Sequence, residues 1–322
     1  MHYRRFPRLE WSVSEIGYGM WGMGGWTGSD DRQSAAALDR SVELGGNFFD
    51  TAWAYGEGRS ERLLGELLRR HPQKQLFTAT KVPPKNWKWP GKASTPADEV
   101  FPYDHVVEYT EASLENLGVK TLDLQQLHVW DDSWTADDGW KRAVEALKRE
   151  GRILAFGISV NRWEPENVLA ALETGLVDAV QVVYNIFDQA PGDALFSACG
   201  RLDVAVIARV PFDEGGLTGT LTADSSWPAG DFRNIYFKSP NLQQTLERVA
   251  PLHRVVDGWG ATLPEVALRW ILANTSVTTT IPGMRTLGHV ESNLAASGRP
   301  LDREAMERLR AFRWDRRPDD RA

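Results

Sequence analysis

Short apolar segments alternate with helical patterns along almost the whole chain, and this alternation limits the fold more than any other feature. Candidate strands occupy residues 16–21, 47–50, 76–80, 122–127, 153–157, 179–183, 204–208 and 277–281. Strands that alternate with helices predict a parallel sheet. Eight such units without a linker predict an α/β fold of the closed (β/α)₈ TIM-barrel type, as a single domain over residues 1–322.

The segments between the candidate strands show helical periodicity. The expected helices are 31–44, capped by Ser29 or Asp30, and 59–70, 103–117, 137–150, 164–174, 193–198, 242–256, 264–272, 287–295 and 302–312. Residues 2–13 predict a capping β-hairpin, and we expect residues 315–322 to be frayed. The loops after strands 1, 3 and 7 are long, which is unusual unless they cover a site.

Composition excludes several classes of function. A net charge of −7 disfavours nucleic acid as a partner. Cys199 is the only cysteine, so no intrachain disulfide can form, which is compatible with a reducing compartment. No apolar run reaches membrane-spanning length and no signal peptide is visible, so we expect a cytoplasmic protein. The six histidines are scattered and favour no metal site.

Ionisable residues stand where successive candidate strands end. Asp50 ends the second strand and Tyr55 follows it in a loop, Lys81 ends the third, and His128 ends the fourth. Each has a structural alternative, since Asp can cap a helix, Lys can be solvated in a loop and His can sit in a core. In a barrel, however, the carboxyl ends of the strands meet at one rim, so we expect the four side chains to converge.

These four residues, with the flanking segments 49–52 and 126–128, resemble the aldo-keto reductase superfamily, from residue 16 to about 296. The resemblance implies NADPH-dependent reduction of an aldehyde or ketone to an alcohol, with hydride from the nicotinamide. Its catalytic tetrad falls on Asp50, Tyr55, Lys81 and His128. Tyr55 would be the general acid, Lys81 would lower the tyrosine pKa from about 10, Asp50 would anchor Lys81, and His128 would orient the carbonyl.

The glycine pattern at 17–22 matches G-x-G-x-x-G, but a flexible loop follows it where a dinucleotide fold would open a helix. We therefore reject a Rossmann domain. The resemblance implies NADP(H), preferred over NAD(H), along the barrel mouth. The implied contacts are Trp21, Asp50, Ser159 and Gln181 near the nicotinamide, Arg209, Val210, Phe212, Leu217 and Gly219 from strand 7 and its loop, and Gly283, Met284, Arg285, His289 and Asn293 at the adenosine end.

Arg285 near a helix start suits a 2′-phosphate, because guanidinium and backbone N–H groups both favour an anion. Three positions depart from the family pattern. Val160 separates Ser159 from Asn161, Ser292 replaces a common Glu, and Arg209 replaces an aromatic residue. A guanidinium should repel an oxidised nicotinamide, so we expect the reduced cofactor to bind better.

Many of the 14 tryptophans fall in expected loops, including Trp26, Trp89 and Trp134. Trp53, Trp87 and Trp130 predict an apolar or aromatic substrate wall, and a sugar carbonyl stays open because tryptophan also stacks on sugars.

Two alternatives to a small-molecule carbonyl reductase stay open. A nicotinamide-binding regulatory protein of the channel β-subunit type, with little turnover, is disfavoured because no long basic or hydrophobic extension is visible. A barrel lyase using Lys81 as a Schiff base would need an uncharged lysine, whereas Asp50 would keep it protonated.

Overall fold

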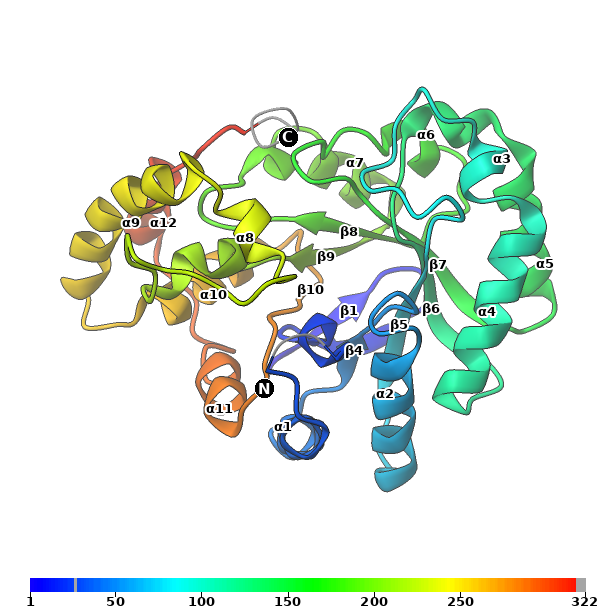
Figure 1. Ribbon diagram of the computed structural model, residues 1–322, viewed down its shortest axis with the longest axis horizontal. Helices are drawn as coiled ribbons and strands as arrows, with labels where there is room; N and C mark the ends of the chain where they lie inside the picture. The colour runs from blue at the N-terminus through cyan, green and yellow to red at the C-terminus, as the bar shows by residue number, and fades with distance from the viewer. Residues whose placement is uncertain (26–27, 317–322) are drawn as a thin grey trace.

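Residues 1–25 and 28–316 are described by the computed structural model, in which parallel strands form a barrel surrounded by helices (Figure 1). The eight-stranded sheet runs in the order β10-β9-β8-β7-β6-β5-β4-β3, with every pair parallel. Its strands are β3 Tyr18–Gly19, β4 Phe48–Asp50, β5 Phe77–Val82, β6 Leu122–Leu127, β7 Ile153–Ser159, β8 Ala179–Val183, β9 Ala205–Arg209 and β10 Thr279–Thr280. The (β/α)₈ prediction is confirmed, while the expectation of one domain over 1–322 stays a prediction.

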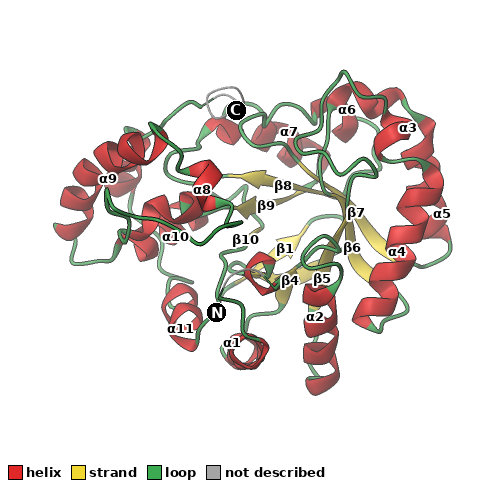
Figure 2. Ribbon diagram, viewed as in Figure 1, coloured by secondary structure: helices red, strands yellow, loops and turns green. Residues whose placement is uncertain are grey.

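Helices surround the strands, as the red and yellow ribbons of Figure 2 show. The α-helices are α1 Asp31–Glu43, α2 Arg59–Arg70, α3 Ala97–Val100, α4 Tyr103–Leu117, α5 Asp138–Arg149, α6 Leu169–Leu172, α7 Leu195–Leu202, α8 Arg233–Tyr236, α9 Asn241–Asp257, α10 Leu263–Leu272, α11 Leu287–Leu294 and α12 Arg303–Arg310. Short 3₁₀ helices are η1 Trp21–Met23, η2 Asp132–Ala136, η3 Ala190–Gly192 and η4 Asp213–Thr218. Asp30, not Ser29, caps α1, by accepting a hydrogen bond from the Gln33 amide at 2.7 Å.

The seam between the first and last strands closes the barrel. The amide of Gly17 donates to the Thr280 carbonyl at 2.8 Å, and that of Gly19 to the Pro282 carbonyl at 3.0 Å. A Cβ on Gly19 would lie 2.6 Å from the carbonyl oxygen of Ile281, closer than packed atoms approach. Gly19, the second glycine of the G-x-G-x-x-G match, therefore allows the first and last strands to approach closely.

The strands at this seam are shorter than predicted. Residues 16–21 and 277–281 contribute only two residues each to β3 and β10. Beyond them the chain pairs through single parallel bridges, Ile16 with Thr280 and Gly19 with Gly283, so closure depends on isolated contacts.

The predicted N-terminal hairpin is present as β1 Tyr3–Phe6 and antiparallel β2 Trp11–Ser14. Phe6 and Val13 are fully buried in one apolar cluster with side chains of the barrel strands. The Phe6 ring lies 6.5 Å from that of Phe48, between centroids. The hairpin therefore caps the barrel interior with apolar side chains.

The expected helix over 164–174 is wrong in extent, because only α6 forms there. Polar contacts with a distant segment replace its first turns. The amide of Asp132 donates to Asn167 Oδ1 at 2.7 Å, and the Asp132 carboxylate accepts from the amides of Ala170 and Ala171 at 2.7 and 3.0 Å. A carboxylate at a helix start satisfies amides that have no intrahelical partner.

The expectation of a frayed tail over residues 315–322 is wrong at Arg316. Arg316 is buried, with 1% of its side chain exposed, and pairs with two aspartates. Residues 317–322 lie outside the described residues.

Long segments that hold only short helices follow β3, β5 and β9, over residues 20–25 with 28–30, 83–102 and 210–240. They leave from the carboxyl ends of their strands, where a barrel of this type carries its site. Within residues 1–25 and 28–316, no helix is both long and apolar enough to cross a bilayer.

Replacing Gly19 with Ala should lower the free energy of unfolding by about 1–3 kcal/mol, because the new methyl group overpacks the seam. Chemical denaturation measures this difference. Gly200→Ala is the matched control, since nothing lies within 4 Å of a Cβ at Gly200 in α7. That control should be neutral or slightly stabilising, and equal behaviour of the two variants would contradict the role given to Gly19.

Candidate active site

A buried ion pair lies at the carboxyl ends of β4 and β5. Lys81 Nζ donates to Asp50 Oδ1 at 2.5 Å and to the Thr51 carbonyl at 2.7 Å. The Lys81 side chain is fully buried, and 3% of that of Asp50 is exposed. Residue 50 pairs in register with Ala79, so the two strands bring the acid beside the lysine.

Two glutamines complete the surroundings of Asp50. Its second oxygen, Oδ2, accepts from Gln181 Nε2 at 2.7 Å and from Gln126 Nε2 at 3.2 Å. Gln181 was expected in the site, whereas sequence reasoning missed Gln126. A polar residue inside the apolar run 122–127 was the available signal, since a buried amide needs partners.

Tyr55 lies beside this pair, half-buried in the loop after β4. Lys81 Nζ lies 5.1 Å from the centre of the Tyr55 ring. Burial raises the pKa of Tyr55, and the positive charge of Lys81 offsets part of that rise. The lowering effect expected of Lys81 is present, but the removal of water outweighs it, so the pKa of Tyr55 is raised overall.

His128 follows β6 and faces Tyr55, with ring centroids 5.6 Å apart and planes at 74°. Its Nδ1 is buried and has no hydrogen-bond partner in the part of the chain that the structure describes. Burial, then the charges of Lys81 and Arg209, hold the pKa of His128 well below its usual value. The imidazole is therefore neutral at neutral pH, and its Nδ1 keeps unused hydrogen-bonding capacity.

Arg209 ends β9 close enough to this group to affect the pKa of both Tyr55 and His128. It donates from Nη2 to the Val160 carbonyl at 3.0 Å. Burial and the neighbouring charge of Arg162 lower the pKa of Arg209 to about 10, so it stays protonated at neutral pH. Arg209 Nε and Arg162 Nη1 are buried donors without a partner among residues 1–25 and 28–316.

Ser159 and Gln181 are neighbours, because β7 and β8 pair them in register. Asn161, which Val160 separates from Ser159, is fully engaged elsewhere. Its side chain bonds the backbone of Gly91 in both directions, at 2.9 and 3.2 Å, and donates to Glu164 at 2.8 Å.

The other expected cofactor positions divide by exposure. Leu217 and Met284 belong to the core and are buried as whole residues, 0% and 1% exposed, so neither is open to a ligand in this structure. Asn293 is also buried. The remaining ones are at least partly exposed: Trp21, Val210, Phe212, Gly219, Gly283, Arg285 and His289.

Arg285 lies against the loop after β3, two residues before α11 begins. Its Cδ would be 2.9 Å from a Cβ on Gly22, so the absence of a side chain there makes room for the arginine. Arg233 lowers the pKa of Asp231 against the rise that burial causes, and the charge of Arg285 adds a smaller lowering effect. Gly22, the last glycine of the G-x-G-x-x-G match, thus leaves space for the Arg285 side chain.

Aromatic rings line the approach to His128. The centroids of Trp53 and Trp87 are 6.0 Å apart, those of Trp87 and Trp89 are 5.8 Å apart, and Trp89 meets His128 edge-on at 5.8 Å. The assignment of Trp130 to this wall is wrong. Trp130 is fully buried and packs on two other rings.

These two rings are Trp134 and Trp140, with centroids 5.8 and 5.2 Å from that of Trp130. Trp130 therefore belongs to the core, whereas the Trp89 ring contacts that of His128. Trp26 lies outside the described residues.

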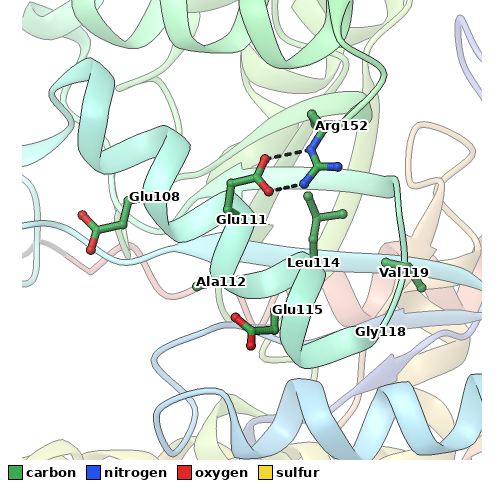
Figure 3. A pocket seen from close by; sticks show the side chains of 8 residues that line it. All are labelled: Glu108, Glu111, Ala112, Leu114, Glu115, Gly118, Val119 and Arg152. Atoms are coloured by element: carbon green, nitrogen blue, oxygen red, sulfur yellow. Dashed lines mark hydrogen bonds and ion pairs between the residues drawn. The ribbon is translucent and has the colours of Figure 1, made fainter.

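A shallow depression of about 580 Å³ lies elsewhere, along α4 (Figure 3). Glu111 and Arg152 form an ion pair on its wall, with Nε 2.7 Å from Oε1. Arg152 directly precedes β7 and Gly118 ends α4, so the depression lies toward the amino ends of the strands, away from the tetrad. In the described ranges, no three His, Cys, Asp or Glu side chains gather as a metal site would require.

Replacing His128 with Asn should flatten the dependence of stability on pH. The folded protein disfavours protonated His128, while the unfolded chain binds that proton below its ordinary pKa, so wild-type stability falls as pH drops below about 6.5. The free energy of unfolding should fall less steeply in the variant than in wild type, by up to about 1.4 kcal/mol per pH unit. Urea denaturation between about pH 7 and pH 5 measures this, and parallel curves would contradict the assignment.

Comparisons with known proteins agree with the barrel fold. The family model described as the aldo/keto reductase family matches residues 15–313. The NADH-specific methylglyoxal reductase of Escherichia coli (strain K12) is 27% identical over 299 residues, covering 88% of this chain and 90% of that protein. A Schizosaccharomyces pombe aldo-keto reductase named for NADP(+) is 26% identical over 309 residues, covering 93% and 88%.

Among solved structures, an aldo-keto reductase from Bacillus halodurans in its holo form has a TM-score of 0.77 and 25% identity, and the match covers 100% of both chains. Sequence and fold thus agree over nearly the whole chain. The chain belongs to the aldo/keto reductase family, whose members are oxidoreductases that act on carbonyl groups with nicotinamide cofactors.

Proposed function

We propose that the protein reduces an aldehyde or ketone to an alcohol, using NADPH, with Tyr55 as the general acid. One observation carries the proposal. Lys81, held by Asp50, lies against the ring of Tyr55, and the unpartnered Nδ1 of His128 stands beside them. A proton donor, a fixed positive charge and a hydrogen-bonding ring are the groups that carbonyl reduction needs on the oxygen side.

Tyr55 would deliver the proton. Its raised pKa keeps the phenol protonated at neutral pH. The adjacent Lys81 ammonium stabilises negative charge on the phenol oxygen as the proton leaves, so it favours the transition state more than the ground state. Asp50 holds the ammonium in place through Oδ1.

His128 would orient the substrate. As a neutral imidazole it can donate one hydrogen bond to a carbonyl oxygen without competing with Tyr55 as an acid. Preorganised donors of this kind act strongly where water is excluded.

The residues present fit a nicotinamide dinucleotide. Arg209 Nε and Arg162 Nη1 are buried N–H groups with no partner within the described part of the chain, and they suit carbonyl or phosphate oxygens. Ser159 and Gln181 would hold the carboxamide, and the loop over 210–219 would hold the phosphates. When bound, the reduced nicotinamide supplies a hydride to the carbonyl carbon.

We assign the preference for NADP(H) to Arg285, which is partly exposed beside the start of α11. A guanidinium near a helix start favours the extra phosphate of NADPH. The names of the two relatives differ on this point, one NADH-specific and one naming NADP(+). The preference therefore depends on local residues rather than on the family.

Trp53, Trp87 and Trp89 would form the substrate wall, which suits aromatic, aliphatic or sugar carbonyls. We also propose a cytoplasmic location, since a single buried cysteine suits a reducing compartment.

An NADPH-oxidation screen over aldehydes, aromatic ketones and keto-sugars tests the function. Turnover with any of them supports the proposal. Tight NADPH binding without turnover would favour the regulatory alternative. Borohydride trapping of Lys81 with a carbonyl compound, in the absence of nicotinamide, would favour the lyase.

Tyr55→Phe should reduce kcat by about 10²–10⁴-fold, because the ring remains but the proton donor is lost. NADPH affinity should be nearly unchanged. Tyr103→Phe, on α4 against Arg142, is the matched control and should keep wild-type rates. Steady-state kinetics and fluorescence titration measure both, and a wild-type rate in Tyr55→Phe would discard the acid assignment.

Arg285→Ala should raise the KM for NADPH by about 10- to 100-fold, the loss expected for a hydrogen bond to a charged group. The KM for NADH should change little, since it lacks the 2′-phosphate. Arg303→Ala, on the exposed face of α12, is the control. A similar rise for both cofactors would refute the assignment of cofactor preference to Arg285.

A further inference from the structure

Arg316 stands at the end of the described chain, yet it is buried among loops from the carboxyl ends of the strands. Its Nε donates to Asp188 Oδ1 at 3.0 Å, in the loop after β8. Its Nη1 donates to Asp213 Oδ1 at 2.9 Å, in the loop after β9, and to the Tyr236 hydroxyl at 3.0 Å, in α8. One side chain therefore links three segments that are remote in sequence.

The loop after β9 is strained where Arg316 contacts it. Val210, Asp213 and Glu214 have φ angles of 56°, 48° and 56°, in the left-handed region. Residues other than glycine rarely adopt this conformation, and they keep it only where surrounding contacts enforce it. The loop therefore needs an external restraint.

Two arginines supply that restraint. Arg316 pairs with Asp213, and Arg162, from the loop after β7, pairs with Glu214. The Arg162 guanidinium also lies 4.9 Å from the centre of the Tyr236 ring. Each of the two strained acidic residues is thus paired with an arginine. Both arginines also contact Tyr236.

The described space beside this cluster is too small for a cofactor or a substrate. The space beside Arg316 and Asp188 measures about 30 Å³, the size of one water molecule. The contacts of Arg316 are therefore structural links between loops.

We propose that Arg316 is a positioning residue, which holds the loop over residues 210–219 in the conformation that binds the cofactor phosphates. The proposal rests on the proposed function for the identity of the ligand. It does not place Arg316 in contact with cofactor or substrate. Without Arg316, Asp188 and Asp213 would keep buried charges without this cation, and the strained loop would relax.

The expected consequence is a loss of cofactor affinity rather than of chemistry. If the loop holds its binding conformation about one tenth of the time, the Kd for NADPH rises about tenfold. The value of kcat at saturating NADPH should stay within about twofold, because Arg316 touches none of the four tetrad residues.

The test compares Arg316→Met and Arg316→Lys with Arg313→Met and wild type. Arg313 is a matched control from the same segment, since it pairs with Asp193 and Asp315 at 2.6 Å, away from the β9 loop. Fluorescence titration gives the Kd for NADPH, steady-state kinetics give kcat, and hydrogen exchange without cofactor reports on residues 210–219.

Arg316→Met should show the tenfold rise in Kd and faster exchange confined to residues 210–219 and their neighbours. The Kd and the exchange rate of Arg316→Lys should lie between those of Arg316→Met and wild type, because an ammonium cannot match the forked contacts of a guanidinium. Arg313→Met should match wild type.

Wild-type affinity and exchange in Arg316→Met would overturn the proposal. Faster exchange throughout the barrel in both the Met and Lys variants would also overturn it, in favour of a global role. If wild type binds no NADPH, the proposed function fails, while the exchange of residues 210–219 still decides whether Arg316 positions the loop.

Discussion

The buried pair of Asp50 and Lys81 is the interaction on which the rest of the site depends. Taking two charges out of water is costly, and their attraction compensates only when the remaining hydrogen-bonding capacity is also satisfied. The Thr51 carbonyl and the amides of Gln126 and Gln181 meet that need. The pair and these partners come from four strands, β4, β5, β6 and β8, and from their ends, so the pair is stable only once the barrel has brought these strands together.

The ammonium of Lys81 then influences two further groups. It opposes the rise that burial causes in the pKa of Tyr55, and it adds to the fall that burial causes in that of His128. Both groups are consequently neutral at neutral pH beside a fixed positive charge. This is the arrangement in which a phenol can give up a proton while an imidazole only donates a hydrogen bond.

The loop after β9 follows a different principle. The barrel strands are held by apolar packing and regular hydrogen bonds, whereas this loop has strained backbone and is fixed by one buried and one half-buried ion pair. Such pairs contribute little net stability but penalise alternative arrangements, because separating them leaves a buried charge. In this chain they give a defined shape to a segment that regular secondary structure does not hold.

The sequence by itself determined the barrel, several element boundaries such as those of α2 and β8, and the convergence of Asp50, Tyr55, Lys81 and His128. Hydrophobic periodicity is local, and barrel topology alone places strand ends at one rim. Only the tertiary structure decided the burial of Trp130 and Arg316, the role of Gln126 and the net direction of the Tyr55 pKa. Each of these depends on contacts between residues far apart in the chain, which no local pattern records.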